Sequence, residues 1–147
     1  MSNKSANKTK RLISFRERER DEAAAKMAAT RTSLNEAKAA LESAEESVSQ
    51  EIEQTRSAVG KPVSAEKLNL TADCAQSAAK EVVQKQGSVR EANEALDEDM
   101  DKLMQTHTKV KQMELLLEFQ QRRNERLIRN KEQSTLDDLS VSRKVHK

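Results

Sequence analysis

The side chains best suited to chemistry in this sequence are two histidines, one cysteine and a glycine–lysine pair. A metal site on a helix needs a second ligand about one turn from the first. Leu103 and Lys111 stand one turn before and after His107, and neither is a metal ligand. We therefore interpret His107 as a structural or surface residue, while His146 falls in a basic tail.

Cys74 and the pair Gly60–Lys61 also lack the neighbours that chemistry requires. Cys74 stands beside Ala75, a position of the apolar seam described below, and is interpreted as a small buried or half-buried hydrophobic residue. A phosphate-binding loop needs an earlier glycine and a preceding strand, and Gly60–Lys61 has neither. The sequence therefore predicts a protein that is not an enzyme, with no catalytic residue, metal, cofactor or small-molecule substrate.

The composition favours long helices over a compact globule. Among the 147 residues, 35% are charged and 1% are aromatic, and strong helix formers such as Ala, Leu, Glu, Lys and Arg dominate. This composition is also compatible with disorder, chiefly at the two ends, although a net charge of +2 causes little self-repulsion. No stretch approaches the roughly 20 apolar residues of a membrane span, so we expect a cytoplasmic protein without membrane insertion.

One break divides the chain into two helices. Pro62 follows Gly60 by two residues, and this combination ends one helix and prevents its direct continuation. Ser64 is the expected N-cap of the next helix, with Glu66 in its first turn. The predicted organisation is a single coiled-coil domain over residues 1–147, with a first helix at about 7–58, a turn at 59–64, a second helix at about 65–139 and flexible ends.

Apolar residues recur every seven residues in both helices, which is the signature of a coiled coil. The second helix has the longer series: Leu68, Ala75, Val82, Val89, Leu96, Leu103, Val110 and Leu117. The positions midway between successive members of this series are less regularly apolar: Ala78 or Ala79, Ala92, Met100 and Met113. The first helix has Met27, Leu34, Leu41 and Val48, with Ala23, Ala37 and Ala44 between them.

The short connection favours antiparallel neighbours. Folding about Lys61 places residue i near residue 122 minus i and leaves the longer second helix without a partner beyond about Leu117. The next heptad positions, Asn124 and Lys131, are polar, as an unpaired extension requires. The predicted fold class is all-α, a long antiparallel two-helix coiled-coil hairpin with unequal helices and an overhanging second helix.

Basic residues gather at the two ends of the chain. Residues 1–33 hold nine basic and four acidic side chains and residues 118–147 hold eight and five, whereas residues 34–117 hold ten and sixteen. In a hairpin the two basic segments meet at the open end, where they suit either a solvated helix end or a partner's groove. The candidate partner-binding residues are Phe15, Arg16, Arg18, Arg20, Phe119, Arg122, Arg123, Arg126, Leu127 and Arg129.

Two segments carry motifs of a known family. Residues 12–24, LISFRERERDEAA, resemble the L-x-x-x-R-E-x-x-x-x-x-A opening of the FliJ/YscO (SctO, HrpO) proteins of bacterial type III export. Residues 129–139, RNKEQSTLDDL, are similar to that family's K-E-Q-x-x-L-D-E-L close. The chain length, the break in mid-chain and the unequal helices are also similar, so the resemblance covers the whole chain in outline.

The resemblance implies a non-catalytic central stalk of the export apparatus, similar to the γ stalk of rotary ATPases. The end with both termini would enter the export ATPase hexamer, the rod would reach towards the export gate, and export chaperones would be further partners. The protein would then lie in the cytoplasm, peripheral to the inner-membrane export apparatus. Flagellar and injectisome systems are not separated by these motifs, and the injectisome is the preferred interpretation.

Two alternatives remain open. A generic structural or tethering coiled coil would pair helices between chains and form a stable oligomer. A basic nucleic-acid-binding coiled coil would use the N-terminal lysines and arginines, but alternating Arg and Glu and the near absence of stacking aromatics count against it. We therefore expect no nucleic-acid partner.

Overall fold

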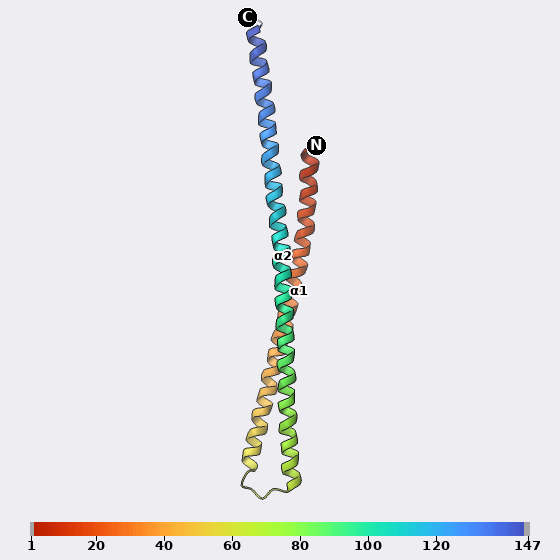
Figure 1. The fold of residues 1–147 in the computed structure, drawn as a ribbon, viewed down its shortest axis with the longest axis vertical. Helices are drawn as coiled ribbons and strands as arrows, with labels where there is room; N and C mark the ends of the chain where they lie inside the picture. The colour runs from red at the N-terminus through yellow and green to blue at the C-terminus, as the bar shows by residue number, and fades with distance from the viewer. Residues whose placement is uncertain (1, 146–147) are drawn as a thin grey trace. The chain divides into compact units, whose positions relative to one another are not determined.

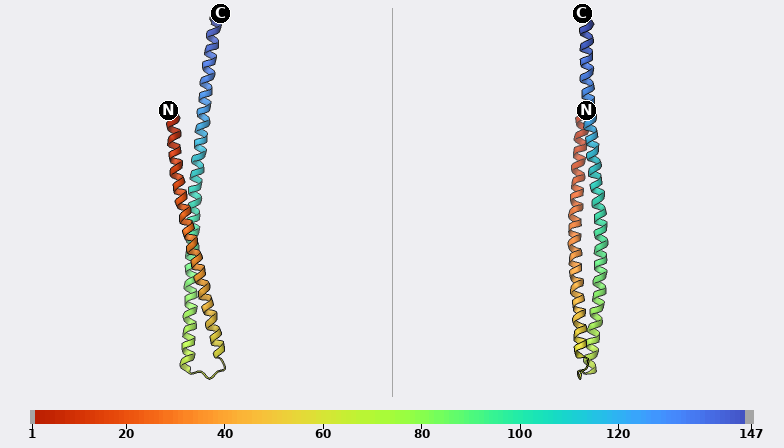
Figure 2. Two further views of the ribbon diagram at one scale, coloured as in Figure 1. Left: turned by 180° about the vertical axis from the view of Figure 1, so that it is seen from behind. Right: turned by 90° about the vertical axis from the view of Figure 1, so that its left-hand side faces the viewer.

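The computed structural model describes residues 2–145, which form two helices joined by one loop (Figure 1). Helix α1 runs Ser2–Ala58 and helix α2 runs Ala65–Val145, and no strand occurs among the described residues. Where the two helices pack against each other, they lie side by side and run antiparallel (Figure 2). The predicted all-α hairpin of unequal helices is confirmed.

Both helices extend further towards the chain ends than the sequence predicts. Helix α1 starts five residues before the expected start at residue 7, and α2 ends six residues after the expected end at residue 139. Neither extension contains glycine or proline, so the backbone has no reason to leave the helix there. The expectation that residues 2–6 and 140–145 lie outside the helices was therefore wrong.

The loop between the helices has the predicted stop and start residues. Gly60 adopts a φ of 90°, a left-handed conformation that glycine accepts without strain and that ends α1. At the other side, the Ser64 hydroxyl accepts a hydrogen bond from the amide of Lys67 at 3.3 Å. Ser64 is therefore the N-cap of α2, and Glu66 in the first turn adds a favourable charge at the positive end of the helix dipole.

Alanine at the two glycines is expected to change stability in opposite directions. Gly60→Ala should lower the free energy of unfolding by about 1 kcal/mol, because a residue with a Cβ is strained at this φ. Gly87→Ala should raise it by about 1 kcal/mol, because Gly87 lies inside α2. An added Cβ meets nothing within 4 Å at either site, so urea unfolding of the two variants isolates the backbone effect. Shifts of the same sign would contradict this account.

The packing of the two helices forms two compact units. The first unit combines α1 up to Glu22 with α2 from Met104 onwards, and the second unit comprises residues 23–103 with the loop. Each helix contributes to both units. That the whole chain behaves as a single domain stays a prediction.

The seam of the second unit contains the predicted apolar residues. Leu34 and Ala44 are buried, and the neighbouring seam side chains are half-buried. The half-buried residues are Ala23, Met27, Ala37, Leu41 and Val48 of α1 and Ala75, Ala78, Val82, Val89, Ala92, Leu96 and Leu103 of α2. Small alanines in this series let the two helices approach closely, as the heptad pattern predicts.

A charged residue occupies one position of this seam. Asp99 is 5% exposed, whereas Met100, the predicted seam residue, is exposed. The Asp99 carboxylate accepts a hydrogen bond from the Thr30 hydroxyl, and its other oxygen lies 3.8 Å from the Lys26 ammonium. Met100 was predicted because it is more apolar than its neighbour Asp99. The spacing of the seam residues on α2 instead runs through Asp99, so the prediction of Met100 was wrong.

The seam of the first unit is more polar. Val110 is fully buried there, and Met113 and Leu117 are half-buried. Thr9 is also buried, and its hydroxyl lies 2.8 Å from the side-chain oxygen Oε1 of Gln120, so that it can donate a hydrogen bond across the seam. Among the described residues, the first unit therefore buries fewer apolar side chains in its seam than the second.

These cross-seam hydrogen bonds define the register of the hairpin. The Thr9–Gln120 and Thr30–Asp99 bonds place residue i close to residue 129 minus i, about one heptad beyond the predicted 122 minus i. The first six residues of α2 consequently lie opposite the loop, which leaves Leu68 exposed although a seam position was predicted for it. At the far end, half-burial on α2 continues to Asn124, beyond the predicted limit of Leu117.

Candidate partner-binding surfaces

Four of the candidate residues share one face of α2 in the first unit. The seam uses Val110, Met113, Leu117 and Gln120. The positions turned furthest from this seam follow steps of four and three residues. We call this set the outer stripe of α2 in the first unit: Leu115, Phe119, Arg122, Arg126 and Arg129, all of them exposed.

The outer stripe of α2 combines an apolar half with a basic half. Phe119, Arg122, Arg123 and Arg126 line a shallow hollow on this face. Arg122 pairs with Glu118 one turn before it, and Arg129 lies 4.0 Å from Glu125. Among the described residues, neither Arg123 nor Arg126 takes part in an ion pair. The hollow therefore offers an aromatic ring beside cations that are available to an acidic partner.

Helix α1 carries a similar set on its own outward face in the first unit. The α1 residues turned furthest from α2 follow the same steps of four and three. We call them the outer stripe of α1: Lys4, Lys8, Arg11, Phe15 and Arg18, all of them exposed. Lys4, Lys8 and Arg11 line a second shallow hollow with Asn7. Since each stripe lies on the side of its helix that faces away from the other helix, the first unit presents two basic faces with one phenylalanine each.

Arg16 and Arg20, also candidates, lie at seam positions of α1. Their side chains are 33% and 32% exposed. Arg16 pairs with Glu19 at 3.1 Å and lies 5.8 Å from the centre of the Phe15 ring. Arg20 lies 3.5 Å from Asp21. These two arginines thus cover the seam with their aliphatic stems and pair with acids of their own helix.

The remaining candidates occupy separate places. Leu127 is exposed at the seam side of α2, beyond the last half-buried residue, Asn124. Phe15 and Phe119 are 52% and 65% exposed, so neither ring is buried within the hairpin. Leu115 was not predicted, because it lies in the leucine-rich stretch 115–117 beside the seam position Leu117. Its spacing of four residues from Phe119 and seven from Arg122 is the signal that assigns it to the outer stripe.

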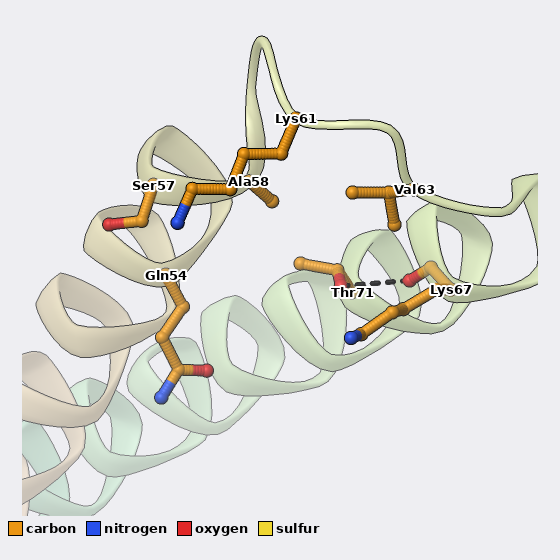
Figure 3. A pocket seen from close by; sticks show the side chains of 7 residues that line it. All are labelled: Gln54, Ser57, Ala58, Lys61, Val63, Lys67 and Thr71. Atoms are coloured by element: carbon orange, nitrogen blue, oxygen red, sulfur yellow. Dashed lines mark hydrogen bonds between the residues drawn. The ribbon is translucent and has the colours of Figure 1, made fainter.

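The loop end of the second unit has a third exposed surface (Figure 3). Gln54, Ser57 and Ala58 of α1 face Lys67 and Thr71 of α2 across a shallow hollow that also includes Lys61 and Val63 of the loop. Three apolar residues that adjoin lining residues in the sequence are exposed: Val59, Leu68 and Leu70. Exposed apolar side chains at this end lose water contact when a protein partner covers them.

The residues considered for chemistry remain separate from one another. His107 is exposed on α2, and Cys74 is exposed on the flank of the seam, so its predicted burial was wrong. Within residues 2–145, no three His, Cys, Asp or Glu side chains are grouped so as to hold a metal ion. His146 lies outside the described residues. No helix in the described part of the chain is long and apolar enough to cross a membrane.

Comparison with known protein families gives a match over almost the whole chain. The family described as flagellar FliJ protein matches residues 7–147, which include α1 from its second turn, the loop and all described residues of α2. No curated protein and no solved structure matches the chain. The family match covers both helices and both motif segments, and the chain belongs to the FliJ family.

Proposed function

We propose that this chain is a non-catalytic central stalk of a bacterial type III export apparatus, located in the cytoplasm beside the inner membrane. The family match supports the export role, and the description of that family favours the flagellar system over the injectisome. The observation that carries the proposal is the pair of outer stripes in the first unit. They give α1 and α2 exposed basic residues on faces turned away from each other.

Two outward-facing basic stripes suit a partner that surrounds the first unit. A single groove covers only one face of a two-helix coiled coil, whereas a ring contacts both faces at once. The export ATPase hexamer is such a ring, and acidic side chains on its inner surface would complement the stripes. Phe15 and Phe119, one on each stripe, supply the aromatic contacts that commonly dominate the binding energy of an interface.

Reversing the charges of the α2 stripe is expected to weaken ATPase binding at least about tenfold. The variant combines Arg122→Glu, Arg126→Glu and Arg129→Glu, and its affinity for the purified ATPase is measured by isothermal titration calorimetry at fixed salt. Three exposed basic residues of the second unit provide the matched control: Arg31→Glu, Lys38→Glu and Lys80→Glu. Equal affinities of the two triple variants would contradict the assignment of the stripe to the ATPase.

The loop end is the surface we propose for the export gate or for export chaperones. Val59, Leu68 and Leu70 are exposed and adjoin in sequence residues that line the hollow of Figure 3. A partner that covers these side chains would remove apolar surface from water, which favours association. This surface belongs to the second unit, so its contacts are separable by mutation from those of the outer stripes.

A further inference from the structure

The start of helix α1, in the first unit, carries positive charge without any acidic residue. Residues 2–16 hold five basic side chains and no acidic one, and the first turn of α1 contains no acid. Four of these basic side chains are exposed and, among the described residues, take part in no ion pair: Lys4, Lys8, Lys10 and Arg11. This segment therefore presents cations that no described acidic side chain neutralises.

These cations stand at the end of α1 where positive charge is least favourable. The unpaired amides of its first turn give a helix a partial positive charge at the N-terminus, so acidic residues stabilise this end and basic residues destabilise it. Lys4 lies in the first turn and Lys8 in the next. An anionic surface bound to this segment would remove the repulsion, which makes such a surface a favourable partner.

The same face of α1 combines phosphate-binding groups with apolar side chains. Its shallow hollow is lined by a polar set: Lys4, Asn7, Lys8 and Arg11. Ammonium, guanidinium and amide groups all donate hydrogen bonds to phosphate oxygens. Leu12 and Phe15 adjoin this set, four residues after Lys8 and Arg11, and are 47% and 52% exposed. Lysine and arginine beside leucine and phenylalanine are typical of a helix that lies at the headgroup level of a bilayer.

Two alternatives fit this segment less well. On the outer stripe of α2, acids of the same helix already compensate the arginines, since Arg122 pairs with Glu118 and Arg129 lies 4.0 Å from Glu125. A nucleic acid would attract the cations of α1, but the backbone of a duplex offers no apolar layer to the two apolar side chains. A bilayer offers such a layer directly beneath its charged headgroups.

We propose that residues 4–15 of α1 bind the surface of a membrane that contains anionic phospholipids. The cations contact the headgroup phosphates, while Leu12 and Phe15 enter the apolar boundary beneath them. The contact is peripheral, since no helix in the described part of the chain is long and apolar enough to span a membrane. The inference goes beyond the stalk function. Because the same face of α1 is assigned to the ATPase, entry into the ring would release the chain from lipid.

Co-sedimentation of the full chain with lipid vesicles tests this proposal. The chain should bind vesicles of phosphatidylglycerol and phosphatidylcholine, bind phosphatidylcholine alone much more weakly, and dissociate as salt is raised. The variant Lys4→Glu, Lys8→Glu and Arg11→Glu should lose about a hundredfold or more in affinity, since each basic residue near the surface contributes a factor of about five. Its helix content by circular dichroism should be unchanged or higher, because acids suit this end of a helix, so unfolding would not explain the loss.

The matched control reverses three exposed basic residues of the second unit, Arg31→Glu, Lys38→Glu and Lys80→Glu, and should bind within about threefold of the wild type. The variant Leu12→Ala and Phe15→Ala keeps every charge and should bind about tenfold more weakly.

Three outcomes would overturn the proposal. The wild type could fail to bind anionic vesicles at low salt. The two charge-reversed variants could lose affinity equally, which would identify net charge as the cause. Binding could also be insensitive to the alanine substitutions and be abolished by a competing DNA duplex, which would identify a nucleic-acid partner. The assay contains no ATPase, so its result is independent of the stalk assignment.

Discussion

Aspartate in place of Val110 is expected to lower the free energy of unfolding by about 3 kcal/mol or more. Val110 is 0% exposed, the most completely buried side chain among the described residues. A carboxylate at this position would lose its hydration between α1 and α2. The two arginines at the α1 seam, Arg16 and Arg20, already pair with acids of their own helix. Urea unfolding followed by circular dichroism measures the loss, which should appear as a lower midpoint.

The same substitution at Val83 is the matched control. Val83 lies on the same helix and is 66% exposed, so the new carboxylate would remain hydrated. Val83→Asp should change the free energy of unfolding by no more than about 0.5 kcal/mol. If both variants lost similar stability, burial at Val110 could not be the cause, and intrinsic helix propensity would be the better explanation.

The second large effect has the opposite sign, because Asp99→Leu is expected to stabilise the hairpin by about 1–3 kcal/mol. Asp99 is 5% exposed, yet its cation, Lys26, has a side chain that is 63% exposed, so the ion pair offsets little of the desolvation of the carboxylate. Removing the acid does not leave the Thr30 hydroxyl unsatisfied, because it can also donate to the carbonyl oxygen of Lys26 at 3.0 Å. Leucine would extend the apolar seam at this position.

Asp101→Leu removes the same charge two residues later, at an exposed position. It controls for the change in net charge and should alter stability by about 0.5 kcal/mol or less. Thermal unfolding monitored at the helical circular dichroism band compares the two variants with the wild type. A lower melting temperature for Asp99→Leu would mean that the carboxylate stabilises the fold through its contacts with Thr30 and Lys26.

Much of the fold could be predicted, because apolar periodicity and helix stop signals act locally. Gly60 and Pro62 locate the break, and Leu34 and Val110 mark the seam. The register could not be derived from the same pattern, since sliding one helix by seven residues again places apolar residues against apolar residues. Polar contacts such as Thr9–Gln120 distinguish one register from the next, and nothing in the sequence marks these residues as a pair.

The candidate surfaces were predicted in part for a similar reason. Phe119 and Arg126 stand at heptad positions away from the seam, which the sequence alone can indicate. The half-burial of Arg16 and Arg20 depends on where α2 passes, and this follows from the register. Exposure of Leu68 likewise results from its position opposite the loop. Residues whose environment is decided by the other helix are thus the ones that sequence reasoning placed wrongly or incompletely.

The register has a consequence for how the length of this chain can vary in evolution. A deletion of seven residues in one helix alone would shift every later cross-seam pair and would separate Thr30 from Asp99 or Thr9 from Gln120. Matched deletions of seven residues at opposing sites of α1 and α2 keep every remaining pair in place and every side chain on its own face. Homologous chains of different length should therefore differ by paired heptads, one in each helix, so that length can change while both outer stripes are retained.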